Sequence, residues 1–173
     1  MYSLPVRLAK FVRFPWRDKL LLGEAWLRLG AARFSILTIP FAKLVTSWGA
    51  PLYETFREEP RDRALVGRVK WAISTSSRYT PWKSNCLPQA MTGKRMLQKR
   101  GLRSTLYLGL LRERSGNVAA HAWLRCGNVF VTGGRGVRFT VVGTFAEMGD
   151  SATGAAMPDT EVSEAFAWLK NEK

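Results

Sequence analysis

The spacing of the apolar residues in this chain changes once, at Gly101. Before this glycine they recur at the three- and four-residue intervals of amphipathic helices in three segments: residues 18–39, 61–74 and 86–99. After it, short runs rich in Val, Thr, Leu and Phe predict strands at residues 104–111, 119–125, 129–132 and 137–145, with a hairpin turn at Gly127-Asn128. Helices followed by consecutive strands predict an α+β fold, with a helix packed on an antiparallel meander, rather than alternating βαβ units.

The length of 173 residues allows one domain with an appendage or two very small domains. We expect a helical N-terminal region over residues 1–60, a core over residues 61–147, and a flexible segment with a closing helix over residues 148–173. Residues 20–45 are the most apolar stretch, but charged residues and Pro40 interrupt it, so no transmembrane helix is predicted. Two cysteines and no secretory signal at the start favour a reduced, cytoplasmic setting.

The chain is strongly basic, with 27 Lys and Arg against 13 Asp and Glu, a net charge of +14 and a pI near 10.6. Residues 1–114 hold 22 of the bases and 7 of the acids, so any anion-binding surface belongs to this part. Nucleic acid, an anionic membrane and an acidic protein are the partner classes that such a charge favours.

The first predicted helix, over residues 18–39, is expected to be amphipathic. Its helically spaced apolar residues are Leu20, Leu21, Trp26, Leu27, Leu29, Phe34 and Leu37, with charged residues between them. The bases of residues 1–33 are interleaved near the start with Phe11, Phe14 and Trp16, which fits a membrane surface, a cover over a basic groove, or a solvated face over a packed helix.

Cys86 and His121 are the candidates for covalent chemistry. His121 is the single histidine and starts a predicted strand, so any imidazole-dependent mechanism must use it. Cys86 stands where a helix begins, and the N–H groups and dipole at that end stabilise a thiolate. The backbone N–H of Cys86 is also the natural oxyanion donor. A helix-start cysteine followed by a strand-borne histidine is the arrangement of papain-like enzymes, in which the imidazole takes the thiol proton.

The alternative is that both residues are structural, with the cysteine buried and the histidine satisfied on the sheet. Cys126 is the poorer nucleophile, because it precedes the hairpin turn and has no helix end to activate it. One histidine and two cysteines without metal-ligand spacing predict no metal site. We expect no cofactor for this chain.

Several segments together resemble the transglutaminase-like cysteine peptidases of lasso peptide biosynthesis. They are residues 84–90 (SNCLPQA), 99–102 (KRGL), 108–110 (LGL), 121–123 (HAW) and 131–134 (VTGG). The match covers about residues 80–146, and the helical first 60 residues also resemble that family. The resemblance implies a helix-start cysteine on an antiparallel sheet, with Cys86 as nucleophile and His121 as general base.

The third member of the triad departs from that family, which places an Asp on the strand after the histidine. No acidic residue occurs between Glu113 and Glu147. Pairing about Gly127-Asn128 puts residues 132–135 beside His121, so Thr132 or a backbone carbonyl could orient the ring. Asn128, a distant acid such as Asp150, or no third residue at all are the alternatives.

The resemblance implies a cysteine endopeptidase that cuts a ribosomally made precursor peptide between leader and core. The freed core amine is then joined to an acidic side chain by a separate ATP-dependent cyclase resembling asparagine synthetase. Residues 1–60 show no strands, so the winged-helix domain that recognises the leader is expected on a separate protein. The alternatives are a non-catalytic basic adaptor for nucleic acid or anionic membrane, and a transglutaminase-like amidase or acyltransferase of other substrate. For the peptidase itself we expect no nucleic acid.

Overall fold

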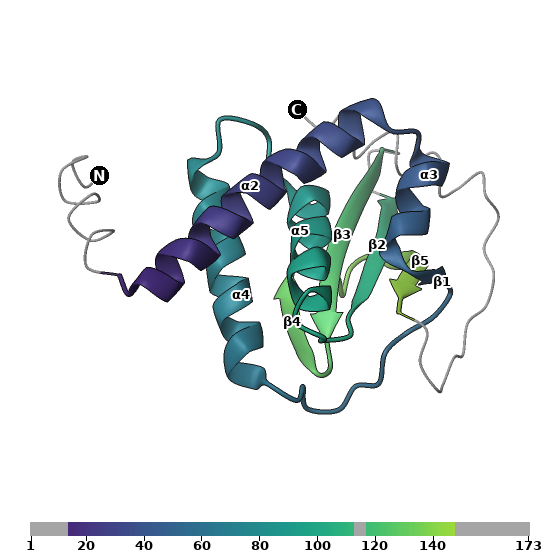
Figure 1. Ribbon diagram of the computed structural model, residues 1–173. Helices are drawn as coiled ribbons and strands as arrows, with labels where there is room; N and C mark the ends of the chain where they lie inside the picture. Colours follow the sequence, from purple (N-terminus) through teal and green to yellow (C-terminus); the bar gives the residue numbers. More distant parts are fainter. Residues whose placement is uncertain (1–13, 113–116, 148–173) are drawn as a thin grey trace.

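The computed structural model describes residues 14–112 and 117–147 (Figure 1). Its helices are α2 (Trp16–Thr38), α3 (Phe41–Val45), α4 (Arg63–Ser76) and α5 (Cys86–Gln98), with short 3-10 turns at Thr46–Trp48 and Ser77–Tyr79. Its strands are β1 (Ala50–Pro51), β2 (Thr105–Arg112), β3 (Val118–Cys126), β4 (Val129–Thr132) and β5 (Thr140–Ala146). The predicted α+β fold, with helices followed by an antiparallel sheet, is confirmed. The segment expected over residues 148–173 lies outside the described residues.

The helix boundaries follow from local chemistry. Pro15 precedes α2 and Pro40 precedes α3, positions at which a missing N–H costs nothing. Asp62 caps α4, and its carboxylate accepts a hydrogen bond of 2.9 Å from the Leu65 N–H. Gly101 takes the left-handed conformation just after α5, with φ of 68°, which ends the helix as its sequence position predicts.

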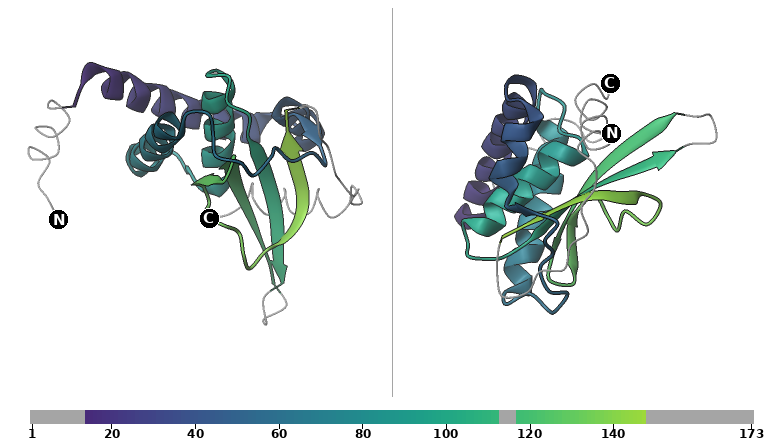
Figure 2. Two further views of the ribbon diagram at one scale, coloured as in Figure 1. Left: turned by 90° about the horizontal axis from the view of Figure 1, so that it is seen from below. Right: turned by 90° about the vertical axis from the view of Figure 1, so that its right-hand side faces the viewer.

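The sheet order is β1-β5-β2-β3-β4, with every pairing antiparallel. The meander prediction is correct for β2, β3 and β4, but β5 crosses back to pair with β2 instead of continuing beside β4. β5 also starts at Thr140, later than predicted, and Val137 is exposed. The expectation of no strand in residues 1–60 is wrong, because β1 pairs Ala50 with Ala146 at the sheet edge. Figure 2 shows the β2–β3 hairpin extending beyond the helices.

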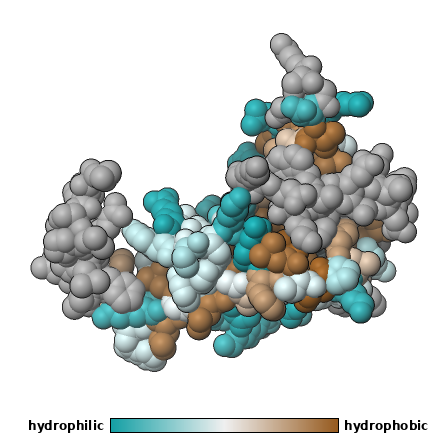
Figure 3. Space-filling view, turned by 90° about the horizontal axis from the view of Figure 1, so that it is seen from above, coloured by the Kyte–Doolittle hydropathy of each residue, from teal (hydrophilic) through white to brown (hydrophobic). Residues whose placement is uncertain are grey.

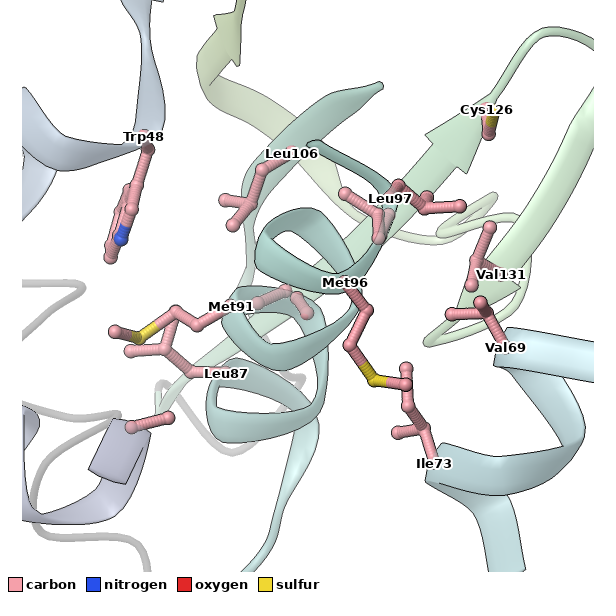
Figure 4. Packing of buried hydrophobic residues seen from close by; sticks show 14 of the residues in the cluster. Trp48, Val69, Ile73, Leu87, Met91, Met96, Leu97, Leu106, Cys126 and Val131 are labelled. Carbon is pink, nitrogen blue, oxygen red and sulfur yellow. The ribbon is translucent and has the colours of Figure 1, made fainter. Parts of the chain in front are cut away.

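The helices cover one face of the sheet and form a single core with it. α5 lies at the centre of this core, with α4 and the strands around it (Figure 4). Met96 of α5 points toward Ile73 of α4, while Val69 of α4 lies near Val131 of β4. α2 packs outside α4 and α5 and contributes Ala25 and Ile36 to the same cluster. The boundary predicted at residue 60 stays a prediction.

The chain that follows β1 packs on part of the opposite face of the sheet. Arg125 is 1% exposed and binds this segment: its guanidinium donates to the carbonyls of Thr55 (2.8 Å) and Phe56 (3.2 Å). It also donates to the Gly127 carbonyl in the β3–β4 turn at 2.6 Å. The same group contacts the Glu54 carboxylate at 3.1 Å, so its buried charge is paired. An arginine on a strand gave no sign of this role in the sequence.

The amphipathic reading of α2 is only partly correct. Leu21 and Leu29 face the core, whereas five of the seven helically spaced apolar residues are exposed: Leu20, Trp26, Leu27, Phe34 and Leu37. The apolar residues do follow helical spacing, but they lie on both sides of the helix. In the described residues, no helix is both long and apolar enough to cross a membrane.

Candidate active site

Cys86 is the first residue of α5, as the sequence predicted, and its side chain is half-buried. The loop before it is held by short-range bonds: Thr80 Oγ1 lies 2.8 Å from Ser84 Oγ, and Gln89 Nε2 donates to the Ser84 carbonyl at 2.7 Å. The first N–H groups of a helix are not used by its own hydrogen-bond ladder. The role of the Cys86 amide as an oxyanion donor stays a prediction.

Trp82 ties the same loop to α2. Its indole lies 4.6 Å from the Trp26 ring, centroid to centroid, and a Cβ added to Gly30 would stand 2.9 Å from Trp82 Cζ2. A larger residue than glycine at position 30 would displace this indole. The structure therefore places Trp82 against α2.

α5 and β3 run in the same direction with their starts at one end of the sheet (Figure 1). Near their other ends, a Cβ added to Gly93 would stand 2.6 Å from Leu124 Cδ2. At the usual rise per residue, Cys86 lies about 10 Å back along the helix from Gly93. His121 likewise lies about 10 Å back along the strand from Leu124. The fold therefore brings Cys86 and His121, 35 residues apart in sequence, to the same end of the sheet.

The imidazole of His121 is held on three sides. Its ring stacks on Phe139 at 4.9 Å and on Trp123 at 5.9 Å, and its Nε2 lies 2.7 Å from the Gly133 carbonyl oxygen. A carbonyl can only accept a hydrogen bond, so Nε2 carries the proton and Nδ1 of the neutral ring is left as the base. The structure thus fixes both the tautomer and the plane of the ring.

His121 shares its face of β3 with Trp123, because side chains alternate along a strand. Trp123 stacks on Tyr107 and lies outside the core cluster under α5, whereas Ala122 and Leu124 belong to that cluster. The imidazole therefore projects from the face of β3 that turns away from the body of α5. Contact between the Cys86 thiol and this ring stays a prediction.

The other residues considered for orienting the ring are placed elsewhere. The Cγ2 of Thr132 would lie 3.8 Å from a Cβ on Gly93, which puts this side chain on the α5 side of the sheet. Asn128 is exposed in the β3–β4 turn, seven residues along the strand from His121. Asp150 lies outside the described residues. Of the alternatives named from sequence, the ring's hydrogen bond uses the backbone carbonyl.

Gly133 supplies that carbonyl because only glycine fits there. Its φ is +71°, and an added Cβ would stand 2.5 Å from the Ala122 carbonyl oxygen and 2.7 Å from Trp123 Cβ. A Cβ added to Gly136 would likewise stand 2.7 Å from the Trp123 indole, and one added to Gly109 would stand 2.8 Å from it. From the sequence alone, no role was assigned to these glycines or to Phe139. The signal that could have found them is the cluster of glycines at residues 133–136, about ten residues after the histidine motif.

Cys126 is unsuited to nucleophilic chemistry. Its side chain is buried at the far end of β3, and burial raises the pKa of its thiol to about 11. A thiol with this pKa is almost wholly protonated at neutral pH. The lower rank given to Cys126 from its sequence position agrees with this environment.

The family model described as the transglutaminase-like superfamily matches residues 25–144, more than half of the chain. This chain belongs to the transglutaminase-like superfamily. The superfamily's cysteine protease-type enzymes fit the papain-like arrangement of a helix-start Cys86 packed on an antiparallel sheet. The match includes α5, β2, β3 and β4, as well as most of α2. No curated protein and no solved structure matches the chain.

Proposed function

We propose that this transglutaminase-like protein is a cysteine endopeptidase that removes the leader from a ribosomally made lasso peptide precursor. The observation that carries the proposal is the state of His121: with Nε2–H held by the Gly133 carbonyl, Nδ1 is left to accept a proton. Cys86 at the start of α5 supplies the thiol at the same end of the sheet. The superfamily match supports chemistry of the cysteine protease or acyltransferase type.

In the proposed mechanism, His121 Nδ1 takes the proton of the Cys86 thiol, and the thiolate attacks the carbonyl carbon of the leader's last residue. The amide at the start of α5 stabilises the resulting oxyanion. The C–N bond then breaks, the imidazolium protonates the leaving amine, and the core departs with a free N-terminus. Water, deprotonated by His121, hydrolyses the thioester and releases the leader as a carboxylate.

The partners in this proposal are the precursor peptide, a separate winged-helix protein that holds the leader, and an ATP-dependent cyclase resembling asparagine synthetase that closes the ring. Tethering the leader beside the thiol raises its effective concentration. We therefore expect slow cleavage by this chain alone, many-fold faster cleavage with the recognition protein, and no need for ATP. Full speed without the recognition protein would contradict the expected division of labour.

The test incubates the full chain with precursor and recognition protein and follows leader and core by mass spectrometry. Cys86→Ala and His121→Ala should each lower the rate by about 10⁴ or more, since both act on the same covalent step. Cys126→Ala is the matched control, because it removes the chain's other thiol at the far end of β3. Undiminished cleavage by Cys86→Ala would overturn the proposal. Transfer of the leader to an added amine in preference to water would identify an acyltransferase instead.

A further inference from the structure

The outer side of α2 is an apolar strip. Trp16, Leu27 and Phe34 are 65%, 66% and 67% exposed, and Leu20 and Leu37 extend the same side. From Trp16 to Phe34 the strip runs about 27 Å along the helix. Of the charged side chains of α2, which the structure describes in full, Arg17 alone is exposed and the others are partly buried.

The inner side of the same helix is also apolar, because Leu21, Ala25, Leu29 and Ile36 are buried. A helix that is hydrophobic on both sides belongs in an environment that covers both. The core covers the inner side of α2, and no described segment covers the strip. Figure 3 shows several brown, hydrophobic areas reaching the surface among teal, hydrophilic ones.

Bases border the strip at its N-terminal half. A hollow of about 450 Å³ between α2, α4 and α5 is lined by Arg17, Arg68, Lys99 and Arg100. Its single acidic lining residue is Glu24, whose carboxylate is 2.6 Å from the guanidinium of Arg100. Asp18 pairs with Arg68 at 2.6 Å, so four bases face two carboxylates and the charge of this border is still positive.

A second hollow, of about 320 Å³, continues along the same flank at the C-terminal half of α2. It is lined by Arg28, Lys43 and Arg95 and by no acidic residue, although Arg28 also pairs with Glu24 at 2.9 Å. Ala31 and Ile39 also line it, so the bases lie beside the apolar strip. Cationic side chains along an exposed apolar helix face are the pattern of helices that lie in the plane of an anionic membrane interface.

We propose that the α2 strip docks this protein on an anionic membrane surface. The strip inserts between lipid headgroups, and the bases of the two hollows contact lipid phosphates. A second copy of the chain fits less well, because pairing two strips would bring like-charged borders together. A flat anionic membrane can contact the α2 strip along its whole length. This docking is independent of the chemistry at Cys86.

The test is flotation of the full chain with vesicles of neutral phosphatidylcholine, with and without about one third anionic phosphatidylglycerol. Most of the protein should float with anionic vesicles at about 0.1 M salt, at least tenfold less with neutral ones, and less again at about 0.5 M salt because screening shortens the reach of the bases. Equal binding to both vesicles, or binding to neither, would overturn the proposal. Binding to neither kind of vesicle would instead favour an acidic protein as the partner of the strip.

The variant Leu27→Glu/Phe34→Glu should reduce flotation at least tenfold, and the milder pair Leu27→Gln/Phe34→Gln covers the case in which the first does not fold. Val137→Glu is the matched control, since Val137 is an equally apolar residue with 84% exposure beyond the sheet. It should float as the parent does. The proposal would be overturned if the α2 variants, folded by circular dichroism, floated like the parent. Cleavage of a soluble precursor by these variants should stay unchanged, which separates this docking from the proposed peptidase activity.

Discussion

The Nε2 atom of His121 lies 2.7 Å from the carbonyl oxygen of Gly133. In Ser-His-Asp triads the corresponding acceptor is a carboxylate, which also stabilises the imidazolium that forms during the reaction. A carbonyl orients the ring equally well but gives the imidazolium less electrostatic stabilisation. Orientation of the imidazole therefore depends on the backbone conformation of one glycine.

Gly133→Ala should damage both stability and chemistry. The new Cβ would crowd the Ala122 carbonyl oxygen at 2.5 Å, at a φ of +71° that alanine disfavours. We expect a loss of about 2–4 kcal/mol in the free energy of unfolding, from left-handed strain and overpacking together. Displacement of the carbonyl should lower kcat at least tenfold with a smaller effect on KM, measured with precursor and recognition protein.

Gly134→Ala is the matched control for that change. Its φ is +67°, but nothing lies within 4 Å of the added Cβ. It should lose only about 1–2 kcal/mol and retain its kcat, because the strain is local and the Gly133 carbonyl stays in place. Equal loss of kcat in both variants would show that crowding against Ala122 does not set the position of the base.

The elements that could be predicted from the sequence are those fixed by local patterns. The α5 helix followed from Cys86 and Gly101, and the β3–β4 hairpin from Gly127-Asn128. The place of β5 could not be predicted, because its choice between β4 and β2 is decided by long-range packing. The sequence prediction also did not separate the two apolar sides of α2, because helical spacing alone does not say which side faces the core.

The third residue of the site illustrates a finer limit. Hairpin counting placed residues 132–135 beside His121, but it did not say which face Thr132 would take. A register shift between Leu124 and Arg125 leaves Thr132 opposite Leu124, on the side of α5. The absence of an acid was readable from the sequence, whereas the use of the Gly133 carbonyl depended on backbone geometry.

Removing the charge of Glu147 should destabilise the fold through Lys94. Lys94 is 3% exposed, its Nζ lies 3.0 Å from the Glu147 carboxylate, and it also donates to the Ser104 carbonyl at 2.9 Å. Burial lowers the pKa of Lys94, so its charge depends on this partner. Glu147→Gln should cost about 2–3 kcal/mol, below the range for fully buried pairs because Glu147 is partly exposed.

The double variant Lys94→Met/Glu147→Gln separates loss of the pair from an unpaired buried charge. It should recover much of the stability lost by Glu147→Gln, since no ammonium is then left without a carboxylate. Urea unfolding of the two variants gives the comparison. Removing well-packed atoms costs about 2 kcal/mol or more. If Lys94→Met/Glu147→Gln were less stable than Glu147→Gln by that amount, the packing of Lys94 would matter more than its charge.

Two glycines of α2 should respond in opposite directions to alanine. Gly23 has nothing within 4 Å of an added Cβ, so Gly23→Ala should stabilise the chain by about 0.5–1 kcal/mol through helix propensity. Gly30→Ala places its Cβ 2.9 Å from Trp82 Cζ2, which should cancel that gain and shift the loop before Cys86. Thermal unfolding measures the stabilities, and Trp82→Phe/Gly30→Ala tests whether a smaller ring restores stability. Equal stabilisation by both alanines would show that the Trp82 contact is not tight.

The two thiols should differ sharply in reactivity in the native chain. Burial raises the pKa of Cys126 to about 11, so only about one part in a thousand is thiolate at pH 8. Iodoacetamide at that pH should label one thiol in the native parent and none in native Cys86→Ala. In denaturant it should label two thiols in the parent and one in Cys86→Ala. Rapid labelling of native Cys86→Ala would contradict the burial of Cys126.

The same raised pKa makes a prediction about stability. The folded state favours the protonated Cys126 thiol, so its contribution is complete below the unfolded pKa of about 8.5 and is lost as the pH rises through about 11. The difference in unfolding free energy between the parent and Cys126→Ala should therefore be constant from pH 6 to about 8 and should decrease toward pH 11. Urea unfolding across this range measures it. Cys86→Ala, which removes the half-buried thiol, should leave the parent's decrease between these pH values in place, because Cys126 causes it.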